Sequence, residues 1–275
     1  MNDTTPPPRA DAGLRFLFEE ADLRGEVVQL ESAYADLLAL HHYAPGVARL
    51  LGEFLAAAVL LATTLKFEGR LTLQARSQGQ IPLIMAECSS DLDIRGIARG
   101  AGQATSEHFE QLLAGGQLAI TIDPARGQRY QGVVPLEGDN LERCLDNYFA
   151  QSEQLNTRLW LTADGRQAAG LLLQQLPPQQ ITSNEVRQQQ WQHAETLAAT
   201  ITAEELLTLP PAALLHRLYH EDALRLFEPR PVHFRCSCSR ERTLGALASL
   251  GAEDGESILE EQGLVTMDCE FCNTR

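Results

Sequence analysis

The sequence predicts an α+β fold: a β-rich N-terminal domain with packed helices, then a helical linker, then a small C-terminal four-cysteine zinc module. Three observations support this division. Strand patterns follow one another without alternating helices up to about residue 178, which favours antiparallel pairing. A glutamine-rich helical segment follows, and four of the six cysteines lie in the last 40 residues. We expect a flexible tail at 1–13, a core domain at 14–178, a linker at 179–233 and a zinc module at 234–275.

Periodic apolar side chains predict the elements of the core domain. Residues 31–42, 45–65 and 140–149 carry them at helical spacing. Leu71, Leu73 and Ala75 alternate with polar residues, as in a half-buried strand. Glycine-containing turns separate several of the further strands, which are predicted at residues 81–88, 93–99, 117–122, 129–136 and 157–163.

Two cysteines of the core domain, Cys88 and Cys144, are interpreted as structural. Cys144 shares a helical face with Leu141, Leu145 and Tyr148, which is the spacing of an apolar core stripe. Neither cysteine is therefore expected to take part in redox chemistry.

The linker is predicted to contain three helical segments. Thr182 to Glu185 matches a capping box that opens a polar helix extending to Ile201. Shorter helical runs follow at 203–209 and 212–220. The segment around Trp191 is so polar that its helix must dock against a neighbour to be stable. A marginally stable linker next to a metal-dependent module is a candidate switch element.

The four C-terminal cysteines predict a metal site. They form two close pairs, Cys236-x-Cys238 and Cys269-x-x-Cys272, separated by 30 residues. Zinc favours four thiolates in a tetrahedron at roughly 2.3 Å, and two chelating pairs can supply them. Two unrelated pairs of buried cysteines are the alternative, but charged and hydroxyl side chains surround these four, unlike a core pattern. His233 is a fifth possible ligand and more plausibly a spectator, because four thiolates already complete a structural site.

The same cysteines can be interpreted as a redox device. Zinc-bound thiolates remain nucleophilic towards oxidants, and Arg235, Arg240 and Arg242 favour thiolate near the first pair. The segment from Cys236 to Cys272 has 37 residues, below the roughly 40 at which a chain seldom folds without a metal or disulfides. Loss of the metal should therefore unfold it. A permanent zinc ribbon that serves as a static interaction protein is the main alternative, and a C-x-x-C oxidoreductase is a weaker one.

Composition excludes several function classes. A formal net charge of −15 argues against nucleic-acid binding. The single lysine, Lys66, precedes Phe67, so there is no Walker-type phosphate loop, and other common enzyme motifs are missing. The longest largely apolar run, residues 54–65, is too short to span a bilayer, and the first residues do not form a secretion signal. We expect a cytoplasmic protein that is not an enzyme.

Several phrases along the whole chain resemble one family, the bacterial heat shock protein 33 family of redox-regulated holdase chaperones. The C-x-C and C-x-x-C pairs at this separation are the most specific of these similarities. The matching phrases are LKFEG (65–69), RGIAR (95–99), RYQGVVPLEGD (129–139), SEQLNTRL (152–159), EELLTLP (204–210), HRLYHE (216–221) and CSCSRER (236–242).

The resemblance implies a specific cycle. In that family the reduced protein holds one Zn²⁺ through four cysteines and is inactive. Oxidative stress releases the metal and forms disulfides within each pair, here Cys236 with Cys238 and Cys269 with Cys272. The linker then unfolds, and the protein dimerises and binds unfolding proteins without ATP. The resemblance thus implies that the core domain, residues 14–178, binds clients and forms the dimer. The family's zinc domain normally continues through another strand and a short helix, whereas this sequence ends three residues after Cys272, so we expect an intact metal site in a less well-packed module.

Overall fold

The computed structural model describes residues 11–65, 68–152, 155–250 and 263–275, and the chain divides into two compact units, Met1–Phe234 and Arg235–Arg275. Residues 1–10 of the predicted tail lie outside the described part, as do Lys66 and Phe67. The remainder of the predicted tail does not match the structure, because the first strand already begins at Ala12. The predicted core and the predicted linker belong to the same unit.

The larger unit is built on two six-stranded sheets. In the first sheet the order is β10 (Leu224–Leu226), β1 (Ala12–Phe18), β2 (Leu23–Leu30), β9 (Ala168–Gln175) and β8 (Thr157–Ala163), with β11 (Arg230–Pro231) also beside β1. In the second sheet the order is β12 (His233–Phe234), β5 (Asp93–Arg99), β4 (Leu83–Ser89), β3 (Gly69–Arg76), β6 (Gln117–Pro124) and β7 (Tyr130–Pro135). Described strand pairs are antiparallel, as predicted, except that β12 runs parallel to β5.

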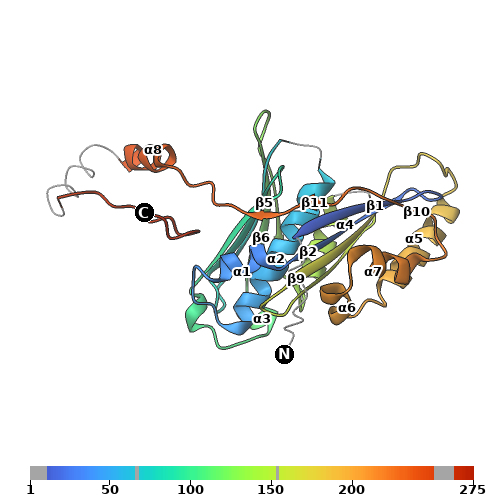
Figure 1. The fold of residues 1–275 in the computed structure, drawn as a ribbon, viewed down its shortest axis with the longest axis horizontal. Coiled ribbons are helices and arrows are strands. Elements are labelled where there is room, and N and C mark those ends of the chain that lie inside the picture. The colour runs from blue at the N-terminus through green and yellow to red at the C-terminus, as the bar shows by residue number, and fades with distance from the viewer. Residues whose placement is uncertain (1–10, 66–67, 153–154, 251–262) are drawn as a thin grey trace, which may run out of the picture. The chain divides into compact units, whose positions relative to one another are not determined.

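Helix α2 (Pro45–Thr64) runs between the two sheets and contacts strands of both (Figure 1). Nearly the whole circumference of the helix is apolar, because one side faces each sheet. Phe54 and Leu60, for example, are fully buried. The 20-residue helix is long and apolar enough to cross a membrane, which corrects the argument from a 12-residue apolar run. Burial gives a better reason to assign it to a core, since 83% of its most apolar stretch lies inside the protein.

Shorter helices complete the layers around the sheets. They are α1 (Ser32–Leu38), the 3₁₀ turn η1 (Ala101–Gln103), α3 (Phe109–Leu112) and α4 (Leu141–Ser152). Helix α4 covers the free edge of β8, where Asp146 accepts a hydrogen bond of 3.3 Å from the Leu159 N–H and Glu142 accepts one from the Leu161 N–H. Two carboxylates one helical turn apart thus accept hydrogen bonds from backbone N–H groups that this strand edge would otherwise leave unpaired.

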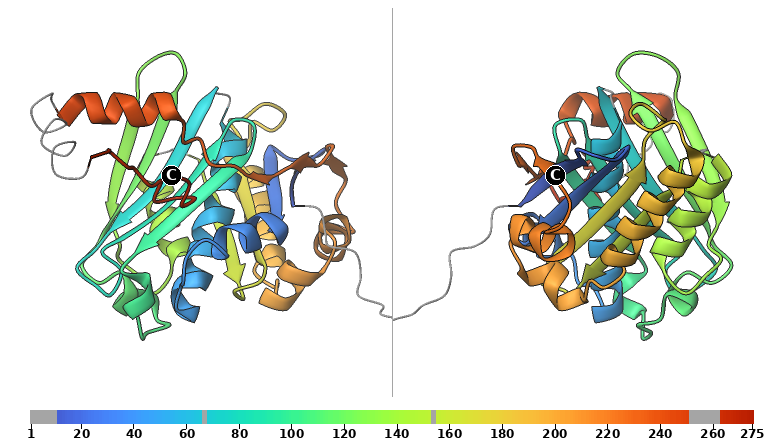
Figure 2. Two further views of the ribbon diagram at one scale, coloured as in Figure 1. Left: turned by 60° about the vertical axis from the view of Figure 1, so that its left-hand side comes forward. Right: turned by 90° about the vertical axis from the view of Figure 1, so that its right-hand side faces the viewer.

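The linker helices α5 (Asn184–Ala198), α6 (Ala203–Thr208) and α7 (Pro211–Tyr219) pack on the face of the first sheet that is turned away from α2 (Figure 2). Trp191, Leu215 and Tyr219 are buried there against side chains of β1, β2 and β9. A second apolar cluster therefore holds helices that are too polar to have a core of their own, as the sequence indicated.

Differences from the predicted elements have local causes. Strands β2 and β9 were not predicted, because both of their faces are covered and alternation is lost; β2 has one partly exposed residue among eight. Strand β1 was not predicted either, although its burial alternates from Leu14 to Phe18. The capping box predicted at Thr182 is wrong: Ser183 caps α5, and the capping box of the linker is formed by Thr202 and Glu205 at α6. The structure also adds α8 (Arg240–Leu250) in the smaller unit.

Candidate metal centre

The four C-terminal cysteines lie on two short segments of the smaller unit. Cys236 and Cys238 come from the extended stretch before α8, and Cys269 and Cys272 come from a turn near the end of the chain. All four side chains are partly exposed. The structure thus brings together the residues that the sequence proposed as ligands.

The spacing of the sulfur atoms suits a tetrahedral metal. All four Sγ atoms lie within 4.8 Å of one another. Cys236 and Cys269 are 3.6 Å apart, and Cys238 and Cys272 are 3.4 Å apart. A zinc ion bound at about 2.3 Å by four thiolates would set them about 3.8 Å apart. The donor set and the spacing therefore fit a zinc ion, which Cys236, Cys238, Cys269 and Cys272 would hold.

Hydrogen bonds fix the two segments locally. In the second, the Asn273 N–H donates to the Cys269 carbonyl at 2.8 Å and the Cys269 N–H donates to the Thr274 carbonyl at 2.9 Å. Asn273 turns the chain with a positive φ of 56°, a conformation that asparagine tolerates. In the first segment, Arg242 donates to the Ser237 carbonyl and hydroxyl, each at 2.9 Å. Arg242 therefore fixes the position of Ser237, the residue between the first two cysteines.

The four thiols differ in acidity. The pKa of Cys238 is raised to about 12 because its thiol shares hydrogen bonds with Cys272 and Cys236. Burial opposes ionisation of Cys272, but hydrogen bonds from Thr274 and Cys238 outweigh it and lower its pKa to about 6. The pKa of Cys269 is raised, mainly by burial. Several thiolates this close repel one another, so full ionisation of the cluster requires a cation among them.

The other residues singled out from the sequence lie elsewhere. His233 is not part of the four-cysteine cluster and belongs to β12, opposite Asp93 of β5. Cys88 and Cys144 are fully buried in the main core, and burial raises their pKa values to about 12 and about 11. Such thiols are poor nucleophiles at neutral pH, which agrees with a structural role.

The polar groups that hold the linker on the core were not predicted from the sequence. The buried Gln29 side chain of β2 donates to the carbonyls of Leu206 and Leu209, each at 2.8 Å, and so caps the C-terminal end of α6. Near the start of the linker, the Arg187 guanidinium lies 2.7 Å from the Asp22 carboxylate. Gln29, a polar residue directly after Val27 and Val28, was the one available signal, and its strand was itself not predicted.

Comparisons with known proteins agree over nearly the whole chain. The family model described as "Hsp33 protein" matches residues 11–275. A "33 kDa chaperonin" of Pseudomonas paraeruginosa is 57% identical over 269 residues, covering 97% of this chain and 91% of that protein. One from Azotobacter vinelandii is 57% identical over 270 residues, covering 95% and 89%. The crystal structure of the Thermotoga maritima 33 kDa chaperonin superposes with a TM-score of 0.81 over 96% of this chain and 93% of that one; at 20% identity it supports the fold alone.

Proposed function

The chain belongs to the Hsp33 family of redox-regulated chaperones, which are holdases and not enzymes, and on that premise we propose how its parts produce the activity. The observation that carries the proposal is the cluster of four cysteine sulfurs within 4.8 Å of one another. The cysteines control the linker, and the linker controls access to apolar surface.

In the reduced state the four thiolates of Cys236, Cys238, Cys269 and Cys272 hold one Zn²⁺. The metal supplies positive charge that keeps four thiolates together and ties the two segments of the smaller unit to each other. Burial is described for residues 235–245, 247, 248 and 263–275 of this unit, and none of these residues is buried. Chelation, not packing, therefore accounts for the order of this unit.

Oxidation removes the ligands. Each pair of thiolates gives up two electrons to form one disulfide, Cys236 with Cys238 and Cys269 with Cys272. Two molecules of hydrogen peroxide accept the four electrons, together with four protons taken from the solvent, to give four molecules of water. The sulfurs then no longer offer four anionic donors, and the smaller unit loses its fold. In the structure, Cys236 contacts Cys269 and Cys238 contacts Cys272, so sulfurs of the two pairs touch each other and must move to the shorter distance of a disulfide within each pair.

Release of the linker helices would expose apolar surface for clients. The aromatic rings of Phe16 and Phe18 on β1 pack against the Tyr219 ring of α7, with centroids 6.2 and 5.0 Å apart. Once α7 leaves, both partners present apolar surface to water, and unfolding proteins can bind it without ATP. We propose that the oxidised chain forms a homodimer, acts in the cytoplasm and binds neither nucleic acid nor membranes.

The experiment that tests this function follows zinc and chaperone activity in the same samples. The reduced, zinc-loaded protein is treated with peroxide at elevated temperature in the presence of a chromogenic chelator. We expect release of about one zinc per chain, suppression of aggregation of a denatured client, an increase in mass by light scattering, and reversal of all three by reductant. Peptide mapping should find the two disulfides within the pairs.

A double variant, Cys88→Ser with Cys144→Ser, is the matched control, because both residues are buried cysteines outside the cluster. It should release zinc and gain activity as the unmodified chain does. Zinc retained under peroxide with no gain in activity would instead identify a static zinc-ribbon interaction protein.

A further inference from the structure

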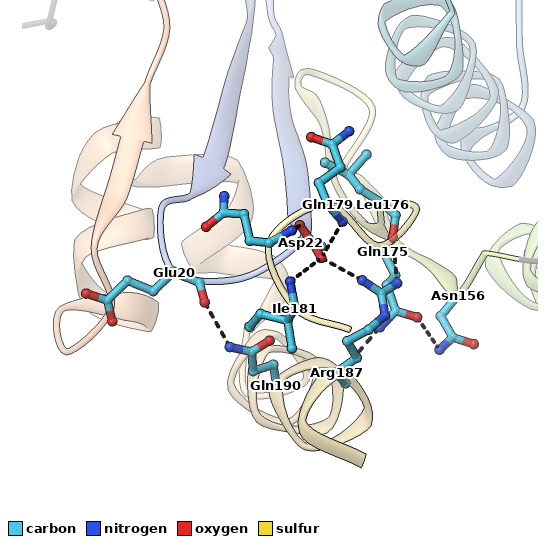
Figure 3. Close-up of polar contacts among 10 residues, drawn as sticks. Glu20, Asp22, Asn156, Gln175, Leu176, Gln179, Ile181, Arg187 and Gln190 are labelled. Atoms are coloured by element: carbon cyan, nitrogen blue, oxygen red, sulfur yellow. Dashed lines mark hydrogen bonds and ion pairs between the residues drawn. The ribbon is translucent and has the colours of Figure 1, made fainter. Parts of the chain in front are cut away.

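The start of the linker is attached to the core by a buried charged group. Asp22 lies in the turn between β1 and β2 and is 4% exposed, and Arg187 lies in the second turn of α5 and is 8% exposed. Their side chains form an ion pair at 2.7 Å (Figure 3). Both charges are thus removed from water, and each depends on its partner for compensation.

The Asp22 carboxylate has further donors. The backbone N–H groups of Gln179 and Gln180 donate to it at 3.1 Å each, and that of Ile181 donates at 3.4 Å. Burial raises the pKa of Asp22, but these three N–H groups and Arg187 outweigh it and leave the pKa below its ordinary value. Hydrogen bonds to an ionised acceptor are roughly twice as strong as neutral ones.

Arg187 closes the same loop from the other side. Its second guanidinium nitrogen donates to the Leu176 carbonyl at 2.7 Å, and the Gln175 side chain donates to the Arg187 carbonyl at 3.3 Å. The Leu176 N–H in turn donates to the Asp22 carbonyl at 2.7 Å, which extends the pairing of β2 with β9. Residues 176–187 therefore form a closed polar loop around Asp22.

The rest of the linker is held differently. Helices α6 and α7 dock through apolar side chains such as Leu206, Leu215 and Leu218, with Gln29 at one helix end. Every hydrogen bond that described residues donate to the Asp22 carboxylate comes from positions 179–187. Departure of α6 and α7 would leave all of these donors in place.

We propose that Asp22 and Arg187 are positioning residues that set the upstream limit of linker release: residues 176–187 stay on the core after oxidation, and the segment set free begins downstream of Arg187. The inference rests on the proposed release of the linker. In this proposal the Asp22–Arg187 pair determines where the released segment begins, whereas the cysteines determine when it is released.

Hydrogen exchange of the full chain, before and after peroxide, tests the proposal. Oxidation should remove protection from residues 203–219 while the amides of Gln179, Gln180 and Ile181 change by less than about threefold, as expected for separate opening units. In Asp22→Asn, which preserves shape but removes the charge, these three amides should exchange roughly 10- to 100-fold faster in both states. Glu19→Gln is the matched control, because it removes a carboxylate from the same turn whose partner, Arg225, is exposed.

The outcomes separate the two proposals. If residues 179–181 lose protection together with 203–219 in the oxidised chain, the Asp22–Arg187 pair does not limit linker release and this proposal is wrong. If neither region loses protection, the proposed release of the linker is wrong. In the second case, reduced Leu218→Asp provides an independent test, because it disrupts the docking of α7 without oxidant. In this variant the proposal requires residues 179–181 to stay protected while residues 203–219 lose protection. Loss of protection in both regions would contradict it.

Discussion

The two units of the chain are stabilised by different physical means. The larger unit encloses two apolar clusters, one around α2 between the sheets and one beneath the linker helices. In the smaller unit, none of the residues whose burial is described (235–245, 247, 248 and 263–275) is buried, and Leu244, Leu264 and Met267 are among the exposed apolar side chains. The four cysteines form its one cluster of potential metal ligands among the residues described.

This difference explains how one chain can keep a stable core under oxidants while a second unit responds to them. Apolar burial is insensitive to oxidants, because it depends on no reactive atom. Chelation fails as soon as its sulfurs are oxidised. Placing the reactive groups in a unit with little packing means that chemistry at four atoms can unfold the unit they hold without damaging the main core.

The largest expected effect is the loss of a cysteine ligand. Cys269→Ser should remove nearly all bound zinc and the fold of the smaller unit, since structural zinc contributes on the order of 10 to 16 kcal/mol in small domains. Zinc content and calorimetry measure both. Cys144→Ser, in the core, should keep its zinc. If residues 235–275 of Cys269→Ser keep the exchange protection of the unmodified protein, the smaller unit does not depend on chelation for its fold.

A core truncation should give the opposite pattern. Leu60 is fully buried in α2, close to Gly170 of β9. Leu60→Ala leaves a cavity and should lower the free energy of unfolding of the larger unit by about 3 kcal/mol with zinc content unchanged. Urea unfolding followed by tryptophan fluorescence measures this, because both tryptophans lie in that unit. Leu244→Ala, at an exposed site, should change stability by less than about 0.5 kcal/mol. Zinc loss from Leu60→Ala would show that the units are not independent.

Acidity provides a finer comparison, because the larger unit contains a carboxyl group, that of Glu53, which is partly withdrawn from water. Burial, reinforced by Glu142 and opposed by Arg49, raises the pKa of Glu53 to about 8, against 4.5 in the unfolded chain. The folded state therefore prefers the protonated form. Its stability is fully present below pH 4.5 and falls as the pH rises towards about 8.

Between pH 6 and 8 the loss attributable to Glu53 should be about 2 kcal/mol. Glu53→Gln should flatten this part of the pH profile in urea titrations, and Glu110→Gln, at an exposed site on α3, should not. Equal profiles for Glu53→Gln and the unmodified protein would mean that Glu53 is hydrated in solution.

Sequence patterns predicted elements well where one face of a strand is covered. Strands β5 and β8 have the predicted bounds, and β8 alternates between buried and exposed residues. The same approach failed for β2 and β9, which have helices on both faces. Their burial depends on distant segments, α2 and the linker, that no local pattern reveals.

The cysteine cluster could be predicted because chelation imposes a spacing that is visible in the chain. The attachment of the linker could not. Asp22 and Arg187 are 165 positions apart, and Gln29 and Leu206 are 177 apart. The capping box was assigned to Thr182 on a local match, but the chain enters α5 one residue later, at Ser183.

The smallest expected effect tests whether local capping matters once a helix is docked. Thr202 accepts from the Glu205 N–H at 3.2 Å, and the Glu205 carboxylate accepts from the Thr202 N–H at 3.0 Å. Thr202→Ala should cost about 1 kcal/mol, seen as roughly fivefold faster exchange of the α6 amides in the reduced protein. Thr208→Ala, at an exposed threonine of the same helix that caps nothing at its start, should change exchange by less than about twofold. If both variants behave alike, Gln29 and the burial of Leu206 suffice to hold α6, and the docked linker is fixed by its contacts with the core sheet alone.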